Sequence, residues 1–245
     1  YRNTMGLMYW QLDDIWQAPT WATIEYDLTW KMAHYYVRHM YSSLYILLRL
    51  NPYLPSVMDK TAQLSISLAS DLSKTTHNII NCSIKSYDSF QSRYSFEYPI
   101  ITYGVEVIRV DTWHYSDLMD KANCTESTQC LMLCTLNSDS QQATEEQSLF
   151  FARPKNISLY NPNLRIVSLQ QQSPIEIELT INADKPALFV WVEIPEGVSG
   201  YFNRNGFHMF ESQVTITLTS WTSLTNRTHK SSDFTIISLY DVTQS

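Results

Sequence analysis

Short stretches that alternate apolar and polar residues recur from about residue 60 to the end of the chain, and they constrain the fold more than any other feature. They fall at residues 63–68, in part of 101–110, and at 130–136, 164–170, 175–182, 187–193, 214–219 and 234–240. A period of two places the apolar side chains on one face of a β-strand. Turn residues such as Gln172-Ser173-Pro174 separate the stretches. Short strands at this spacing predict antiparallel β-sandwiches.

The first forty residues follow a different pattern. Residues 4–12 form a short apolar run that suits a buried strand, and a loop rich in Trp and Pro follows over residues 13–23. Residues 29–41 predict a helix, with Lys31, Arg38 and His39 facing water. The opposite face of this helix would hold Trp30, Ala33, His34, Val37 and Tyr41. A strand, a long loop and a helix make a single unit of an α/β fold.

Length and composition narrow the class of protein. The 245 residues suffice for one large domain or two ordinary ones with real cores. Hydrophobic residues make up 44% and charged residues 17%, which is typical of an ordered globular protein. The formal net charge of -7 and the lack of a basic patch argue against nucleic acid as a partner. The longest apolar stretch, residues 44–50, is interrupted by Arg49 and is too short to span a membrane.

Glycosylation sequons favour a secretory route. They begin at Asn81, Asn123, Asn156 and Asn226. The cysteines are Cys82, Cys124, Cys130 and Cys134, and no C-x₂-C spacing occurs among them, so we expect no metal site. Cys130 and Cys134 would share one strand face, but they lie too far apart along it to bond each other. Sequence alone leaves the choice among three full pairings open.

Two blocks of the sequence resemble β-mannosidases of the lysosomal type, within glycoside hydrolase family two. In the first block, residues 4–21 read TMGLMYWQLDDIWQAPTW, like the eighth barrel strand and following loop of these (β/α)₈ enzymes. Residues 24–26 and 30–38 continue the likeness into the last barrel helix, and the second block comprises residues 189–192, 205–207 and 234–240. The resemblance implies a mainly β fold. The last strand and helix of a (β/α)₈ barrel would occupy residues 1–41, and two immunoglobulin-like β-sandwich domains would occupy residues 42–153 and 154–245.

The implied activity is hydrolysis of terminal, non-reducing β-D-mannose residues of oligosaccharides and N-glycoprotein glycans by a retaining mechanism. Such enzymes use two carboxyl groups, one as acid/base and one as nucleophile. The family carries them in an Asn-Glu pair and in a Ser-Glu-(Phe/Tyr)-Gly stretch, and neither occurs in this sequence. We therefore assign no catalytic residue and expect the chain alone to be inactive. Glu25, Asp13 and Asp14 are interpreted as loop or capping residues.

By resemblance, the chain would supply one wall of the sugar pocket, because these active sites lie at the C-terminal ends of the barrel strands. Trp10 lies late in the expected strand, where its ring can stack on a pyranose, and it is the one substrate-binding residue assigned. Trp16 and Trp21 are expected to pack, and His34 is expected in a core or an interface. Without neighbouring barrel strands, residues 1–41 are not expected to complete a core of their own.

The resemblance also implies that no metal or organic cofactor is needed. The expected partners are a β-mannoside oligosaccharide, bound through the complete barrel, and the remainder of the same polypeptide; a lysosomal location is expected. The family counterpart of Cys124 and Cys130 implies a disulfide between them, whereas Cys82 and Cys134 either pair or stay free.

Two alternatives remain open. One is a non-catalytic β-sandwich module that binds carbohydrate or protein, and the other is a sister barrel enzyme that acts on β-galactosides or β-glucuronides. The block over residues 4–38 argues against the first alternative, because a free-standing sandwich has no use for it.

Overall fold

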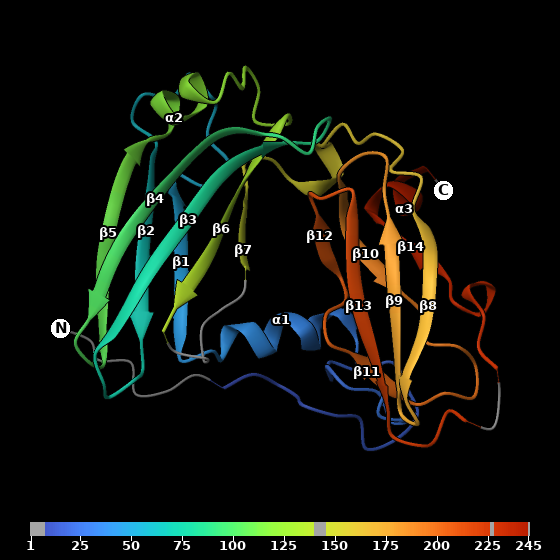
Figure 1. The fold of residues 1–245 in the computed structure, drawn as a ribbon. Coiled ribbons are helices and arrows are strands. Elements are labelled where there is room, and N and C mark those ends of the chain that lie inside the picture. The colour runs from blue at the N-terminus through green and yellow to red at the C-terminus, as the bar shows by residue number, and fades with distance from the viewer. Residues whose placement is uncertain (1–7, 140–145, 226–227, 245) are drawn as a thin grey trace.

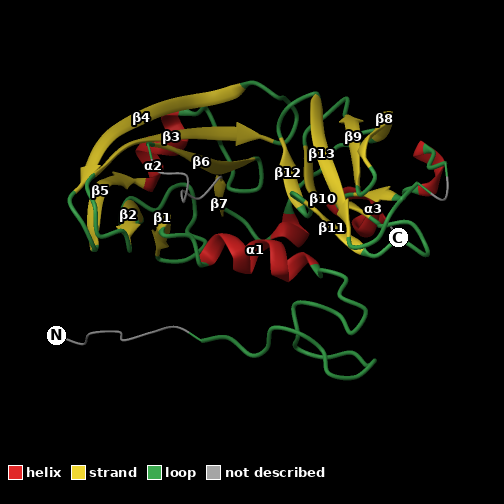
Figure 2. Ribbon diagram, turned by 60° about the horizontal axis from the view of Figure 1, so that its bottom comes forward, coloured by secondary structure: helices red, strands yellow, loops and turns green. Residues whose placement is uncertain are grey.

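Two β-sandwiches lie side by side, and the helix α1 (Met32–Met40) runs beneath them (Figure 1). The structure is a computed structural model that describes residues 8–139, 146–225 and 228–244. Figure 2 shows that the N-terminal loop lies on the side of α1 that faces away from the sheets. Within the described residues, no helix is long and apolar enough to cross a membrane.

The first sandwich packs a three-stranded sheet against a four-stranded one. The first sheet has the order β1 (Leu44–Asn51), β2 (Gln63–Ser70), β5 (Glu106–His114), and the second has the order β4 (Ser92–Thr102), β3 (Thr76–Ser86), β6 (Cys130–Ser138), β7 (Glu146–Phe150). Sequence alternation decides which side chains face inward, since Leu64, Ile66 and Leu68 of β2 are fully buried. The short helix α2 (Tyr115–Lys121) closes one end, where Tyr115 and Leu118 join the same core.

Strand β6 is buried on both faces, which explains its nearly continuous apolar sequence. One face belongs to the core of the first sandwich. On the other face, Leu131 and Leu133 join a smaller cluster with Leu188 and Phe210 of the second sandwich. The two sandwiches are therefore joined by apolar contact.

The second sandwich follows the strands predicted in the last third of the chain. One sheet has the order β11 (Gly200–Phe202), β13 (Gln213–Ser220), β9 (Glu176–Asn182), β8 (Arg165–Ser173), and the other has the order β12 (Phe207–Met209), β10 (Ala187–Val192), β14 (Ile236–Ile237). Two short 3₁₀ helices, η1 (Pro154–Asn156) and η2 (Ser231–Asp233), lie in the connections. Ile177, Leu179 and Ile181 of β9 are fully buried and face the core between the sheets.

The strand predicted over residues 4–12 is not formed in its described part, residues 8–12, and residues 4–7 lie outside the described residues. Met8 and Trp10 are 89% and 75% exposed rather than buried. An extended segment becomes a strand only when a neighbouring strand satisfies its backbone groups. Within the described part of the chain, the carbonyls of Gln11 and Leu12 accept hydrogen bonds only from the loop residues Thr23 and Ile24.

Two further strand predictions are corrected by turn and cap chemistry. The chain turns near Gly104 (φ 150°), between two strands. Residues 101–110 therefore contain the end of β4 and the start of β5, which belong to different sheets. Residues 234–240 keep only the short β14 before the helix α3 (Leu239–Gln244) begins. The cause is Asp241, whose carboxylate accepts hydrogen bonds from the backbone N–H and the hydroxyl of Ser238, both at 2.8 Å. This pairing resembles a capping box, and it starts a helix.

The helix predicted over residues 29–41 is confirmed, but its buried face differs from the predicted one. Ala33 and Tyr41 are exposed, whereas Tyr35 is only 4% exposed and enters the core of the second sandwich. The Tyr35 hydroxyl accepts a hydrogen bond from the backbone N–H of Phe202 at 3.1 Å. Trp30, just before the helix, stacks on Tyr201 with ring centroids 4.4 Å apart.

The rest of α1 is fixed by the segment between β11 and β12. The Tyr36 hydroxyl donates a hydrogen bond to the carbonyl of Gly206 at 2.7 Å, and the Arg38 guanidinium donates to the carbonyl of Asn203 at 2.9 Å. Met32 packs so closely that a Cβ atom on Gly206 would lie 2.6 Å from its Cγ. Gly206 is therefore required both by its φ of +66° and by the nearness of α1.

We expect Gly206→Ala to lower the free energy of unfolding by about 1–3 kcal/mol more than Gly197→Ala, because the added methyl group overpacks against Met32. Gly197 is the matched control, since its φ is +79° but nothing lies within 4 Å of its added Cβ. Urea unfolding of both variants measures the difference. The double variant Met32→Ala/Gly206→Ala should lose the excess, and equal losses for the two single glycine variants would show that α1 does not rest on Gly206.

Candidate functional site

The tryptophan-bearing segment before α1 has its own backbone scaffold. The amides of Thr23 and Ile24 donate to the carbonyl of Leu12 at 3.1 and 2.9 Å, and the amide of Asp14 donates to the carbonyl of Ile24 at 3.1 Å. The amide of Lys31 donates in turn to the carbonyl of Thr23 at 3.0 Å. The loop is thereby tied to the first residues of the helix.

Asp14 is the polar centre of this scaffold. It is only 7% exposed, it accepts a hydrogen bond from the Thr20 hydroxyl, and it pairs with the Lys31 ammonium at 3.2 Å. The Thr20 hydrogen bond and the Lys31 charge hold the pKa of Asp14 below its usual value, although burial opposes the shift. The carboxylate therefore stays ionised, and it connects Thr20 of the loop to Lys31, the residue just before α1.

Three tryptophans project from the scaffold into solvent. Trp10, Trp16 and Trp21 are 75%, 59% and 81% exposed, so the packing expected of Trp16 and Trp21 is not observed in this chain. The peptide bond between Trp10 and Gln11 is cis. The same loop borders an open depression of about 540 Å³, lined by Asp14, Gln17, Ala18, Pro19, Thr20, Glu25, Tyr26, Asp27 and Lys31. Exposed aromatic rings and open polar depressions are both features that sugar rings can bind.

His34 joins the scaffold to the helix. Its Nδ1 lies 3.0 Å from the Thr23 hydroxyl, and its ring meets Trp30 edge-on with centroids 4.5 Å apart. Burial, and secondarily the Arg38 charge, lower the pKa of His34. His34 therefore lies where the loop meets the start of α1, in contact with both Thr23 and Trp30.

A second concavity lies between the sandwiches. It consists of two adjoining recesses of about 530 and 570 Å³ that share Thr135, Arg204 and His208 in their linings. One wall is the outer face of the sheet that contains β3, and the other is the segment 204–211. Helix α1 borders the second recess. We call these two recesses the inter-sandwich cleft.

Two residues that fix the far wall of this cleft were not identified from the sequence. The buried side chain of Asn205 accepts from the amide of Val192 and donates to its carbonyl, both at 2.9 Å, so it pairs with β10 as a strand would. His208 lies with its ring edge-on to Phe189, and burial lowers its pKa to about 4. Residues 205–207 belong to the second block of the resemblance, but nothing in their sequence predicts this contact.

Both disulfides lie in the first sandwich. Cys124 is bonded to Cys130, the pairing that the resemblance implied, and Cys82 is bonded to Cys134 across the neighbouring strands β3 and β6. The described residues hold no group of three or more His, Cys, Asp or Glu side chains that suits a metal ion.

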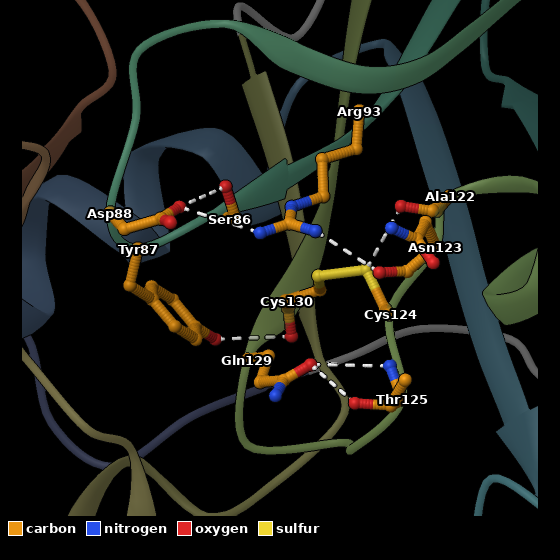
Figure 3. Close-up of a disulfide and its surroundings, with 10 residues drawn as sticks. All are labelled: Ser86, Tyr87, Asp88, Arg93, Ala122, Asn123, Cys124, Thr125, Gln129 and Cys130. Atoms are coloured by element: carbon orange, nitrogen blue, oxygen red, sulfur yellow. Dashed lines mark hydrogen bonds and ion pairs between the residues drawn. A yellow bond between two sulfur atoms is a disulfide. The ribbon is translucent and has the colours of Figure 1, made fainter.

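The Cys124–Cys130 disulfide closes a short loop that several hydrogen bonds hold in place (Figure 3). The Arg93 guanidinium donates to the carbonyl of Asn123 at 3.0 Å, and the amide and hydroxyl of Thr125 both donate to the side-chain oxygen of Gln129. The Tyr87 hydroxyl donates to the carbonyl of Cys130 at 3.2 Å. The disulfide therefore belongs to an ordered turn rather than to a loose loop.

The sequons occupy different environments. Asn81 lies in the middle of β3 and is half-buried, whereas Asn123 is exposed in a left-handed conformation (φ 50°) next to the disulfide loop. Asn156 is exposed in η1. Asn226 lies outside the described residues.

The sequence has relatives among known glycosidases. Residues 159–242 match the family Ig_mannosidase, an Ig-fold domain. Over 242 residues, or 98% of this chain, the sequence is 28% identical to β-mannosidase from Bos taurus, and it covers 26% of that protein. It is 30% identical over 216 residues to a probable β-mannosidase from Caenorhabditis elegans, which corresponds to 85% of this chain and 22% of that protein. The chain thus spans about a quarter of the length of the curated relatives it matches.

Solved structures share the arrangement of the two sandwiches. The β-D-mannosidase from Dictyoglomus thermophilum matches with a TM-score of 0.69 and 16% identity, covering 94% of this chain and 25% of that one. The exo-chitosanase from Amycolatopsis orientalis matches with a TM-score of 0.59 and 12% identity, covering 95% and 31%. At these identities the likeness shows the fold. Together with the sequence relatives, it confirms the resemblance to a C-terminal portion of β-mannosidases and the Ig-like nature of the second sandwich.

We expect loss of the Cys82–Cys134 disulfide to destabilise the first sandwich more than loss of Cys124–Cys130. Cross-linking residues 52 apart in sequence removes more entropy from the unfolded chain than cross-linking residues 6 apart. The loop-entropy relation gives about 4 kcal/mol for the longer loop and about 2 kcal/mol for the shorter one. Denaturant midpoints of the paired Cys→Ala variants measure both, and an equal or reversed order would contradict the expectation.

Proposed function

We propose, from the alignment of almost the whole chain with β-mannosidases, that it forms the C-terminal part of a retaining β-mannosidase and supplies one wall of its sugar pocket. In this reading residues 1–41 complete the (β/α)₈ barrel, and residues 42–153 and 154–245 are the two domains that support it. The substrate would be a β-mannoside oligosaccharide that loses its terminal non-reducing mannose.

The observation that carries the proposal is the exposed Trp10 on a scaffold that is otherwise fixed. The loop backbone and the Asp14–Lys31 pair hold the segment against α1, yet the Trp10 side chain is 75% exposed. Exposing a large apolar ring on a well-fixed segment suits a surface that another group covers. By the resemblance, a pyranose and the rest of the barrel are the groups that would cover Trp10.

The two catalytic carboxyl groups would come from the remainder of the polypeptide. Neither of the family's glutamate motifs occurs in this sequence. Asp14 does not replace them, because it is only 7% exposed and its carboxylate is already engaged by the Thr20 hydroxyl and the Lys31 ammonium. Its role is to position the loop.

The nearest alternative is a sister enzyme acting on another β-glycoside. An exo-chitosanase shares this fold, so the two sandwiches do not select the sugar. The mannoside assignment rests on sequence relatives such as the β-mannosidase from Bos taurus, the probable β-mannosidase from Caenorhabditis elegans and β-mannosidase A from Emericella nidulans. Rates of the complete enzyme on aryl β-mannoside, β-galactoside and β-glucuronide distinguish the candidates.

A secretory, lysosomal location fits the covalent chemistry of the chain. Two disulfides in one sandwich suit an oxidising compartment, and three sequons lie within the described residues. We propose N-glycosylation at one or more of Asn81, Asn123, Asn156 and Asn226.

We expect the 245-residue chain alone to show no hydrolysis of an aryl β-mannoside above the buffer rate, because it lacks both the acid/base and the nucleophile. A fluorogenic assay of the purified chain measures this. Turnover that Glu25→Gln abolishes would identify Glu25 as catalytic and would contradict the assignment of no catalytic residue.

In the complete enzyme, we expect Trp10→Ala to lower kcat/KM by about two- to twelvefold, since an aromatic contact contributes about 0.5–1.5 kcal/mol beyond its area burial. Trp21→Ala is the comparison variant, because Trp21 is a similarly exposed indole on the same loop, and a smaller loss is expected there. Melting temperatures confirm that both variants fold. An unchanged kcat/KM in folded Trp10→Ala would remove Trp10 from the pocket.

A further inference from the structure

We infer that Asn81 carries an N-linked glycan whose first sugars fill the inter-sandwich cleft. This inference rests on the proposed secretory route but not on the proposed hydrolytic activity. It assigns to one sequon a structural role that the others do not share.

The position of Asn81 in the sheet directs its side chain into the cleft. It lies in β3, opposite Glu97 of β4 and Thr135 of β6, and all three line the 530 Å³ recess. The next residue, Cys82, points to the opposite face and is buried in the first core. Because side chains alternate along a strand, Asn81 points away from that core and toward the second sandwich.

Several polar side chains share the recess with Asn81. In the described part of the chain, no side-chain hydrogen bond is made by Asn81, Ser83, Ser95, Glu97 or Thr135. Three of them, Asn81, Ser83 and Thr135, are half-buried. Half-buried polar groups ordinarily find a partner in protein or in ordered solvent. A polyhydroxylated chain starting at the Asn81 amide would supply such partners over this whole face.

The opposite wall suits the same occupant. Arg204 lies over the ring of Phe207, with its guanidinium carbon 4.3 Å from the ring centroid, and it borders both recesses together with Glu211. Charged and aromatic groups that face an open polar recess bind hydroxyl groups and the apolar faces of sugars. The recesses fall within the range of about 300–1,000 Å³ typical of ligand sites.

The order of events follows from the pairing of β3. The transfer forms a bond between the Asn81 amide nitrogen and C1 of the oligosaccharide, and it breaks the bond from C1 to a lipid diphosphate, which leaves as the amide loses a proton. Strand β3 is paired on both sides and Cys82 is bonded to Cys134, so the transferase must act before the sheet and this disulfide form. Docking of the second sandwich then encloses the first sugars.

The experiment uses the 245-residue chain secreted from a eukaryotic host, with Asn156 as the exposed control sequon. Glycopeptide mapping should find Asn81 modified. An endoglycosidase should release the Asn81 glycan from native protein at least about tenfold more slowly than the Asn156 glycan, because release requires local opening of the cleft. After denaturation and reduction, both should be released alike.

Variants separate the glycan from the side chain. Asn81→Gln and Ser83→Ala should each remove the resistant glycan, whereas Ser83→Thr preserves the sequon and should retain it. An unmodified Asn81, or native release as fast as at Asn156, would overturn the inference. Absence of glycan from every sequon would overturn it together with the proposed secretory route, whereas a glycan at Asn156 alone would overturn only the inference.

Discussion

The insertion of Tyr35 into the core of the second sandwich is the contact on which the rest of the arrangement depends. The ring is buried beside Trp191, and its hydroxyl satisfies the amide of Phe202. Burial raises the pKa of Tyr35 to about 12, so this hydroxyl stays protonated at physiological pH. Removing such a partner leaves a buried amide unsatisfied, at a cost of about 1–3 kcal/mol. The sequence of α1 resembles the end of another domain, but the contact of Tyr35 makes this helix part of the second sandwich.

Two functional surfaces follow from the placement of α1. On one side, Lys31 and His34 hold the loop that exposes Trp10, so the proposed sugar wall is positioned by the second sandwich rather than by its own strand. On the other side, Tyr36 borders the inter-sandwich cleft and bonds to Gly206. The second sandwich, through α1, therefore fixes the orientation of the loop that carries Trp10.

Much of the fold was predictable from local patterns, and the remainder depends on contacts distant in sequence. The strands at residues 63–68 and 175–182 alternate so cleanly that period alone identified them. Strand β3 was missed because its inward positions include Thr76 and Asn78, which are buried but polar. The capping pair of Ser238 and Asp241 was readable from its spacing, yet the apolar residues before it suggested a strand.

The candidate site, too, was predictable from the sequence only in part. The tryptophan segment was predicted by resemblance to a family, but its exposure and its clamp were not, since Thr20 and Lys31 give no signal before folding places them around Asp14. The role of Tyr35 was also missed, because helical spacing alone favoured Ala33 and Val37. Which face of a helix is buried depends on the surface that the helix packs against. Here that surface includes Phe202, 167 residues further along the chain.

Native-state hydrogen exchange of the intact chain tests the central claim, that α1 is part of the second sandwich, most directly. If Tyr35 anchors the helix, the amides of residues 36–40 should exchange with free energies close to those of β9 and well above those of residues 15–21. Protection of α1 no greater than that of the loop would show that the helix does not belong to this sandwich and would contradict the account.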